Sequence, residues 1–205
     1  MDKQQLIKLT ALRLGNVRGL DTMIDAEIDA TVVRLENEPF HPWFLLSENN
    51  IYRTTPGENR VPVPDEFLAE YDNGSLYIKL ENGFWQQLPK MSQEEMMQDF
   101  QGEMSMPRGY SLTNKYFRLF PTPDAEYELE LLFYRRSASI AGTNAWYKEA
   151  SDLVIYETAS HILLARKDKR AGVMQGLADG QKQALMARHT EREEANRDGF
   201  LGGYD

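Results

Sequence analysis

Residues 126–134 read EYELELLFY, and the alternation in this stretch decides the fold class. Apolar side chains occur at Tyr127, Leu129, Leu131 and Phe133. The positions that alternate with the first three are glutamates, Glu126, Glu128 and Glu130. Successive side chains of a strand point to opposite faces of a sheet, so this period of two predicts a strand with one buried and one solvated face. One solvated face is typical of antiparallel sheets.

Residues 51–134 around this stretch also have β character, with turn-forming pairs between short apolar and aromatic runs. Asn82-Gly83 predicts a hairpin with a primed turn between residues 75–80 and 84–88. Two further strands are expected at residues 110–112 and 116–120. Between the hairpin and the strand at 110–112, Ser92 and Glu95 have the spacing of a capping box, which predicts a short helix up to residue 100.

Two helices are expected before this region. The apolar spacing over residues 2–14 predicts a short helix that ends at Gly15-Asn16. A second helix should begin near Asp21 or Thr22, either of which can cap it, and end before Pro39. Residues 41–46 then form a buried anchor. The inward stripe of the second helix is Ile24, Ile28, Val32 and Leu35.

Two helices are also expected after the β region. Asn144 can cap one long helix, and a further helix spans residues 173–196, weakened by Gly176 and Gly180. The segment 181–197 has few large apolar residues, so it either frays or is covered by a partner. The side chains expected to point inward from the long helix are Trp146, Leu153, Tyr156, Ile162 and Leu163.

Together these elements predict an α+β fold, in which N- and C-terminal helices form a bundle and an antiparallel β region is inserted between them. We expect one domain over residues 1–205. Its segments are the N-terminal helices (1–46), the β insertion (50–136), the C-terminal helices (144–197) and a flexible docking tail (198–205).

Composition excludes several classes of protein. The 205 residues contain 23 Lys and Arg against 32 Asp and Glu, a net charge of -9, which argues against tight wrapping of nucleic acid by a basic surface. There is no cysteine, so disulfides, thiolate metal sites and cysteine nucleophiles are excluded. No apolar run is long enough to span a membrane, and the first residues do not resemble a secretory signal.

No motif for catalysis or for a cofactor is found. The three histidines, His41, His161 and His189, do not have ligand spacing, and Glu157 with His161 is interpreted as a pair on one helix face. Neither a phosphate-binding glycine loop nor a G-x-S-x-G nucleophile turn occurs. We therefore predict no catalytic, cofactor-binding or metal-binding residue.

Two other functions stay open at this point. Glu126, Glu128 and Glu130 could line a cleft in which paired carboxylates perform acid–base catalysis, although a solvated strand face explains them more simply. A sheet that binds single-stranded nucleic acid is the weaker alternative. Its binding residues would be Tyr116, Phe117, Phe133 and Arg135.

The order of several short motifs along the chain is more specific than any one of them. After the first two helices, WFL occurs at 43–45, VPVPDEF at 61–67 and YFRLFPTP at 116–123, followed by the strand at 127–134 and the helix that opens at Trp146. This series, over about residues 6–169, resembles the head-to-tail adaptor, or connector, proteins of tailed bacteriophages. In VPVPDEF one spacing residue is displaced from the family pattern.

The resemblance implies a virion structural protein of the neck, at the head-tail junction, assembled in the host cytoplasm and without contact to a membrane. It would form a homo-oligomeric ring, typically of twelve copies, below the portal. The ring would extend the DNA channel, touch the genomic DNA transiently and carry the tail or nozzle protein. The family's shared motifs are structural, so no catalytic residue carries over. The alternative for a virion protein is a carboxylate-dependent peptidoglycan hydrolase, which would need two acidic side chains that converge in a cleft.

Two sets of contact residues follow from this hypothesis. Apolar groups on the glycine-rich end of the chain could dock into a groove of the portal protein, and these are Phe200, Leu201 and Tyr204. The thinly apolar last helix would gain burial from a neighbouring subunit of a ring. The inter-subunit residues expected there are Leu185, Met186, Arg188 and Arg192.

Overall fold

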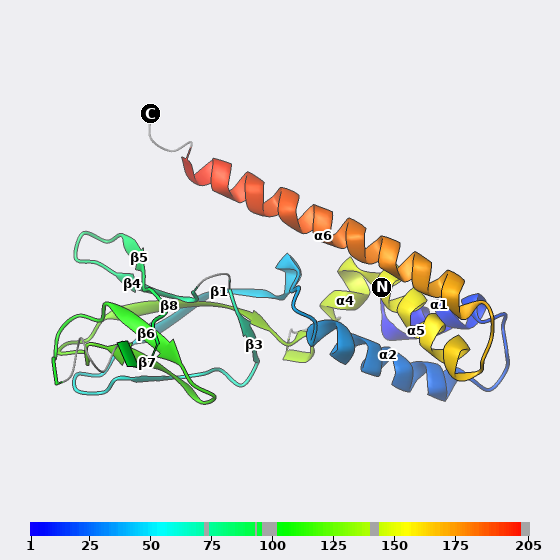
Figure 1. Ribbon diagram of the computed structural model, residues 1–205, viewed down its shortest axis with the longest axis horizontal. Coiled ribbons are helices and arrows are strands. Elements are labelled where there is room, and N and C mark those ends of the chain that lie inside the picture. The colour runs from blue at the N-terminus through cyan, green and yellow to red at the C-terminus, as the bar shows by residue number, and fades with distance from the viewer. Residues whose placement is uncertain (72–73, 93, 96–101, 140–143, 202–205) are drawn as a thin grey trace. The chain divides into compact units, whose positions relative to one another are not determined.

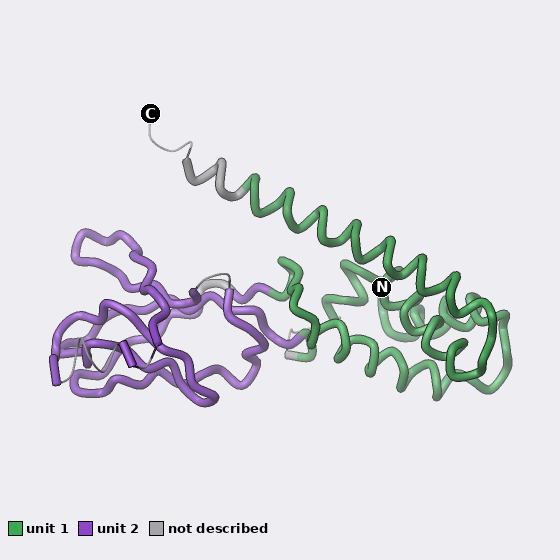
Figure 2. The backbone as a smooth tube through the Cα atoms, in the orientation of Figure 1, with its two compact units in different colours: residues 1–45, 137–205 green, residues 46–136 purple. Residues whose placement is uncertain are grey.

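The computed structural model describes the backbone of residues 1–71, 74–92, 94–95, 102–139 and 144–201. The side chains of residues 48–49, 139 and 196–201 are not described. The chain divides into two compact units (Figure 2): unit 1 contains residues 1–45 and 137–205, and unit 2 contains residues 46–136. Helices and antiparallel sheets are both present, so the predicted α+β class is confirmed. That the chain is a single adaptor domain stays a prediction.

Unit 1 is helical (Figure 1). Its α-helices are α1 (Lys3–Arg13), α2 (Asp21–Glu36), α4 (Ala145–Glu149), α5 (Ser151–Ala165) and α6 (Ala171–Leu201), and its 3₁₀ helices are η1 (Trp43–Leu45) and η2 (Ser137–Ser139). Helix α5 contacts α1, α2 and α6, so it is the centre around which the unit packs. Among the described residues, no helix combines the length and the apolar character needed to cross a membrane.

The first two helices lie where residue spacing predicts them. Helix α1 begins with a capping box, in which the Gln5 N–H donates to the Asp2 carboxylate at 2.8 Å. The inward stripe of α2 is confirmed, since Ile24 and Ile28 are fully buried and Val32 and Leu35 nearly so. The predicted cap of α2 is wrong, because Asp21 is already helical and the cap position is Leu20, without a side-chain hydrogen bond.

The long helix expected after Asn144 is two helices. Asn144 caps α4 as predicted, because its Oδ1 accepts a hydrogen bond from the Trp146 N–H at 2.9 Å. The chain then leaves helical geometry at Ala150, where φ is -138° and ψ is 38°. Helix α5 starts directly afterwards and buries Leu153, Ile162 and Leu163. Tyr156, also expected to point inward, is only half-buried.

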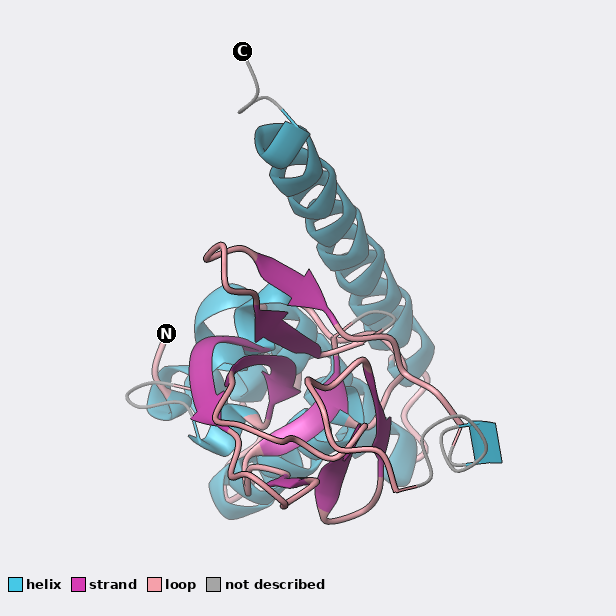
Figure 3. Ribbon diagram, turned by 90° about the vertical axis from the view of Figure 1, so that its left-hand side faces the viewer, coloured by secondary structure: helices cyan, strands magenta, loops and turns pink. Residues whose placement is uncertain are grey.

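Helix α6 is longer than predicted at both ends and continuous along its length (Figures 1 and 3). Its inner face carries Ala171, Ala178 and Leu185, which are all at least nine-tenths buried. These positions are seven residues apart, about two helical turns, so they lie on one face. The small side chains at two of the three positions let α6 pack closely on α5.

Unit 2 consists of two antiparallel sheets. The five-stranded sheet has the order β1-β8-β4-β5, with β3 also paired to β8, and the three-stranded sheet has the order β2-β7-β6. The strands are β1 (Leu46–Arg53), β2 (Arg60–Pro62), β3 (Phe67–Glu70), β4 (Leu76–Lys79), β5 (Trp85–Gln87), β6 (Gly109–Leu112), β7 (Tyr116–Phe120) and β8 (Glu128–Arg135).

Strand β8 is the centre of unit 2, as the alternation of residues 126–134 predicts. Leu129, Leu131 and Phe133 are fully buried, whereas Glu128 and Glu130 on the other face are partly exposed. The buried face packs in one cluster with Phe117 of β7 and with residues of β4 and β6. The strand pairs with β1, β3 and β4, so most of the larger sheet depends on its register.

The predicted hairpin is formed by β4 and β5, but its turn differs from the prediction. The Gly83 N–H donates to the Leu80 carbonyl at 2.9 Å, and only Gly83 has a positive φ, of 86°. A primed turn needs a positive φ at one of its two central residues, which here are Glu81 and Asn82. In this connection the residue with positive φ is Gly83, which follows the two central residues. The Ser92–Glu95 capping box is formed. The rest of that predicted short helix lies outside the described residues.

Candidate functional site

The residues expected between subunits divide into buried and exposed ones on α6. Leu185 is only 1% exposed, so its apolar side chain is covered by its own unit and does not need a partner. Met186 is 43% exposed, and Arg188 and Arg192 are exposed as well. A role of these three residues between subunits stays a prediction.

The two arginines are held by an aromatic cluster. The Arg192 and Arg188 guanidinium groups lie 4.5 and 5.6 Å from the Trp43 ring centroid. His189 stacks on Trp43 at 6.4 Å between centroids and contacts Phe40 edge-on at 5.2 Å. Each cation–π contact at an exposed site contributes about 0.5–1 kcal/mol. The cluster therefore fastens the middle of α6 to the segment that links α2 and η1.

The anchor expected at residues 41–46 is confirmed in part. Leu45 is fully buried, and Phe44 is half-buried with its ring edge-on to Trp146 at 5.1 Å. Trp43 is also half-buried, because one side of its ring faces α6. The anchor thus binds α4 through one aromatic ring and α6 through the other.

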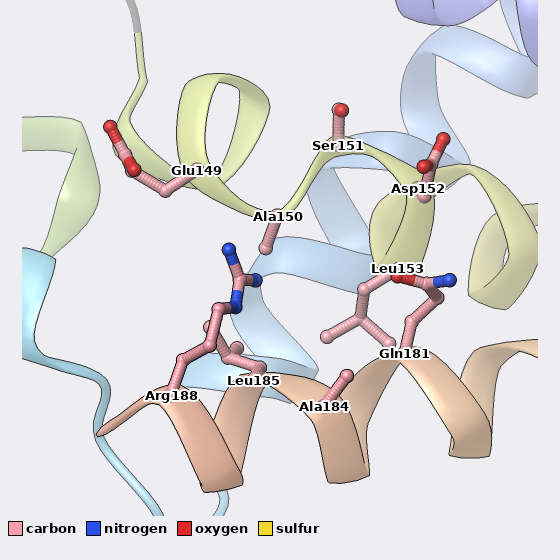
Figure 4. Close-up of a pocket in the computed structure, with 9 residues that line it drawn as sticks. All are labelled: Glu149, Ala150, Ser151, Asp152, Leu153, Gln181, Ala184, Leu185 and Arg188. Atoms are coloured by element: carbon pink, nitrogen blue, oxygen red, sulfur yellow. The ribbon is translucent and has the colours of Figure 1, made fainter. Parts of the chain in front are cut away.

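A cavity of about 230 Å³ lies where α6 passes the junction of α4 and α5 (Figure 4). In this view the Arg188 guanidinium points toward Ala150, the residue at which the two helices separate. The carboxylates of Glu149 and Asp152 point away from each other. A glycosidase needs two converging carboxyl groups, so this cavity does not support the hydrolase alternative.

The histidine and glutamate pair on α5 is a helix-face pair, as interpreted from its spacing. His161 Nε2 lies 3.3 Å from Glu157 Oε1, and Gln175 Nε2 lies 3.4 Å from Glu157 Oε2. Glu157 thereby helps to join α5 to α6. Within the described part of the chain, no group of three or more histidine, aspartate and glutamate side chains is arranged to hold a metal ion.

Two of the three candidate glutamates, Glu126, Glu128 and Glu130, form ion pairs with cations. Glu128 lies 2.7 Å from the Lys79 ammonium and 3.2 Å from the Arg53 guanidinium, and Glu126 lies 2.9 Å from Arg53. The hydrogen bond and charge of Lys79, and then Arg53, lower the pKa of Glu128 below its ordinary value. A general acid would need a raised pKa, so this is a solvated strand face.

The nucleic-acid alternative is wrong for two of its residues. Phe117 and Phe133 are both fully buried in the core of unit 2, and a base cannot stack on a buried ring. Tyr116 is half-buried beneath the Arg60 guanidinium, which lies 4.7 Å from its ring centroid. The aromatic residues of these strands therefore serve the core of the sheets.

The predicted docking tail starts later than expected, because α6 continues through Leu201. The side chains of Phe200 and Leu201 and the whole of Tyr204 lie outside the described residues. Their role in docking stays a prediction.

Two exposed features were not predicted from the sequence. Phe84 is 64% and Trp85 38% exposed at the β4–β5 hairpin, and β5 is an edge strand. The available signal was a pair of large aromatic residues directly after the Asn82-Gly83 turn. The cluster around Trp43 was missed too, although Arg188 and Arg192 are four residues apart and so share a helix face.

Comparison with known proteins identifies one family. The model of the family described as SU10 adaptor protein matches residues 1–199, which covers both units. No curated protein matches the chain.

Proposed function

The chain belongs to the SU10 adaptor protein family, a phage adaptor-type family, and on this premise we propose that it is the head-to-tail adaptor of a tailed bacteriophage. In this proposal it is a structural protein of the virion. Copies of the chain form a ring below the portal, extend the DNA channel and provide the platform to which tail components attach.

The family match over residues 1–199 is the observation that carries the proposal. It includes the helical unit 1 and the β unit 2, and also the part of α6 around Arg188 and Arg192. The proposal therefore concerns the whole chain and is not based on a shared fragment.

The charge of the chain supports a channel role. The net charge of -9 gives a ring of copies a strongly negative field, and DNA is negatively charged along its length. Negative walls repel DNA, so the genome can slide through the channel without binding to it. Transient contact with genomic DNA is expected at most.

Helix α6 is the element that we propose for contact between copies. Met186, Arg188 and Arg192 are exposed along it, and neither arginine forms an ion pair with a described residue. Two cationic side chains on an acidic chain can pair with carboxylates of a neighbouring copy. The end of the same helix, with Phe200, Leu201 and Tyr204, is proposed to dock into the portal.

The test is the mass in solution, measured by light scattering on the purified chain with and without the cognate portal. We expect a closed ring, either of the chain alone or only with portal. A chain that lacks residues 198–205 serves as the matched variant and should lose portal attachment. A persistent monomer that ignores the portal would overturn the proposal, and a peptidoglycan-hydrolysis assay would follow.

A further inference from the structure

Three polar side chains form a row across the three-stranded sheet of unit 2. Arg60 of β2 is the direct partner of Arg118 of β7, and Arg118 is the direct partner of Ser111 of β6. Side chains of directly opposite residues lie on the same face of a sheet, with their Cβ atoms about 4.5–5.5 Å apart. The three residues are called the donor row here, because each side chain carries a hydrogen-bond donor.

The donor row lies on the face of this sheet that points away from the core of unit 2. Leu119 follows Arg118 and Tyr110 precedes Ser111, and both are fully buried in that core. Successive side chains of a strand point to opposite faces, so the row points away from it. Arg60 is exposed, Arg118 half-buried and Ser111 only 7% exposed. The row is therefore open to solvent at its Arg60 end and covered at its Ser111 end.

Two aromatic rings hold the guanidinium groups of the row. The Arg60 guanidinium lies 4.7 Å from the Tyr116 ring centroid, and the Arg118 guanidinium lies 5.0 Å from the Phe120 ring centroid. Tyr116 and Phe120 are two residues before and after Arg118, so their rings share the face of the donor row. A guanidinium that stacks on a ring keeps the N–H groups of its edge available for an anion.

The donors of the row have no partner in the described part of the chain. Neither Arg60 nor Arg118 forms an ion pair there, whereas Arg53 and Arg108 of the same unit pair with glutamates. The Ser111 hydroxyl and the Nε of Arg118 are buried without a hydrogen-bond partner. Unpaired buried donors and like charges on directly opposite residues both destabilise a sheet. An anion bound between these groups would remove both penalties.

We propose that the donor row is a binding site for a phosphate group. One guanidinium already pairs with both oxygens of a carboxylate, whereas two guanidinium groups and a hydroxyl together suit a tetrahedral group with more oxygens. The backbone of DNA and the free phosphate ion share this chemistry. The site itself does not depend on the proposed function, but DNA as its source rests on it, because the genome would then pass through the ring.

Calorimetric titration with inorganic phosphate, in a phosphate-free buffer of constant ionic strength, tests the site. The unmodified chain should bind phosphate, and Arg60→Gln and Arg118→Gln should each weaken the binding by about tenfold or more, since each removes a charged donor. Arg60 is exposed, so its variant keeps the fold even if Arg118→Gln does not. The matched control is Arg53→Gln, which removes the same charge from a guanidinium that Glu126 and Glu128 already pair. It should leave phosphate binding unchanged.

The variant Ser111→Ala separates phosphate binding from a structural role. Without phosphate it should not lower the stability measured by urea unfolding, because the hydroxyl has no partner to lose. It should nevertheless weaken phosphate binding. A loss of stability with unchanged phosphate binding would mean that the hydroxyl serves only the packing of unit 2, and it would overturn the donor row as a site.

A short, fluorescently labelled DNA duplex distinguishes the two sources of phosphate. Binding measured by fluorescence anisotropy that Arg60→Gln weakens and Arg53→Gln does not would assign the site to the DNA backbone. Binding of inorganic phosphate alone would assign it to free phosphate. The proposal is overturned if neither probe binds, if acetate binds as tightly as phosphate, or if Arg60→Gln and Arg53→Gln have equal effects.

Ring formation on the portal is measured separately, so the two proposals can fail independently. A chain that forms the ring but binds neither phosphate nor DNA refutes the phosphate site and leaves the proposed function standing. A chain that binds phosphate at the donor row but ignores the portal refutes the proposed function and leaves the site standing.

Discussion

Glu36, the last residue of α2, accepts hydrogen bonds from both the backbone N–H and the hydroxyl of Ser137, 101 residues later. The N–H to carboxylate distance is 2.8 Å, and Glu36 is only 5% exposed. Asn144 Nδ2 donates to the same hydroxyl at 3.0 Å. The chain leaves unit 1 shortly after Glu36 and returns to it at Ser137, so this contact holds together the two ends of unit 1 between which unit 2 is inserted.

Removal of the Ser137 hydroxyl should destabilise unit 1. Hydrogen bonds to charged groups contribute about 1.5–3 kcal/mol, and Ser137→Ala takes one from a buried carboxylate. Urea unfolding followed by circular dichroism measures the loss. Ser151→Ala is the control, because the Ser151 hydroxyl has no hydrogen bond to a described residue, and it should change the stability by less than about 0.5 kcal/mol. Equal effects of the two substitutions would contradict the account.

Adjacent residues of α6 should respond very differently to truncation. Leu185→Ala removes a side chain that is 99% buried and should cost about 2–5 kcal/mol of unfolding free energy. Met186→Ala removes a side chain that is 43% exposed and should cost much less than that. Thermal unfolding of the two variants measures the difference. A larger loss for Met186→Ala would mean that α6 packs on another face.

Stability should fall as the pH is lowered through about 6.5. Burial lowers the pKa of His41 below its ordinary value, despite the Glu36 carbonyl at 3.3 Å from Nε2. As the pH falls, His41 of the unfolded chain, with its ordinary pKa of 6.5, is protonated before the buried His41 of the folded chain. Protonation therefore favours unfolding below about pH 6.5. Urea midpoints between pH 8 and pH 5 measure the slope. His41→Gln should flatten it, and an unchanged slope would refute this assignment.

Tyr110 should be essential to unit 2. It is fully buried, its hydroxyl donates to Glu70 Oε1 at 2.8 Å, and it accepts from the Ser75 N–H at 2.9 Å. Burial, and then the Glu70 carboxylate, raise the pKa of Tyr110, so the hydroxyl stays protonated. Tyr110→Phe strands a buried N–H and should cost about 1–3 kcal/mol in urea unfolding.

The same substitution at Tyr127 is the control for Tyr110→Phe. The Tyr127 hydroxyl donates to Asp124 at 2.7 Å, but this contact is exposed to water. Water can replace the lost hydrogen bond there, so Tyr127→Phe should have the smaller effect. The reverse order of the two variants would contradict the described core of unit 2.

Strand β8 and helix α2 could be predicted from the sequence because one physical requirement, the burial of one face, determines the pattern of their residues. The two-residue period of β8 and the i, i+4 stripe of α2 both follow from burial of one face, and Leu129 and Ile28 are indeed fully buried. The break at Ala150 could not be predicted, since alanine is the best helix former and tertiary packing overrides that preference. The hairpin turn was missed because Asn82-Gly83 fits more than one kind of turn.

Contacts between distant segments were the least predictable from the sequence. The stacking of Arg192 on Trp43 joins an exposed arginine to an aromatic residue from the other end of unit 1, and no local spacing indicates it. The buried position of Leu185 was missed for a similar reason. Few apolar residues surround it in the sequence, and the side chains that cover it come from other helices.

The central claim is that copies of this chain form the ring below the portal. Electron cryo-microscopy of the cognate portal incubated with the purified chain tests it most directly. The account predicts a closed ring of density on one end of the portal, around a continuous channel. Portal particles without added density, at concentrations that saturate any binding, would contradict it.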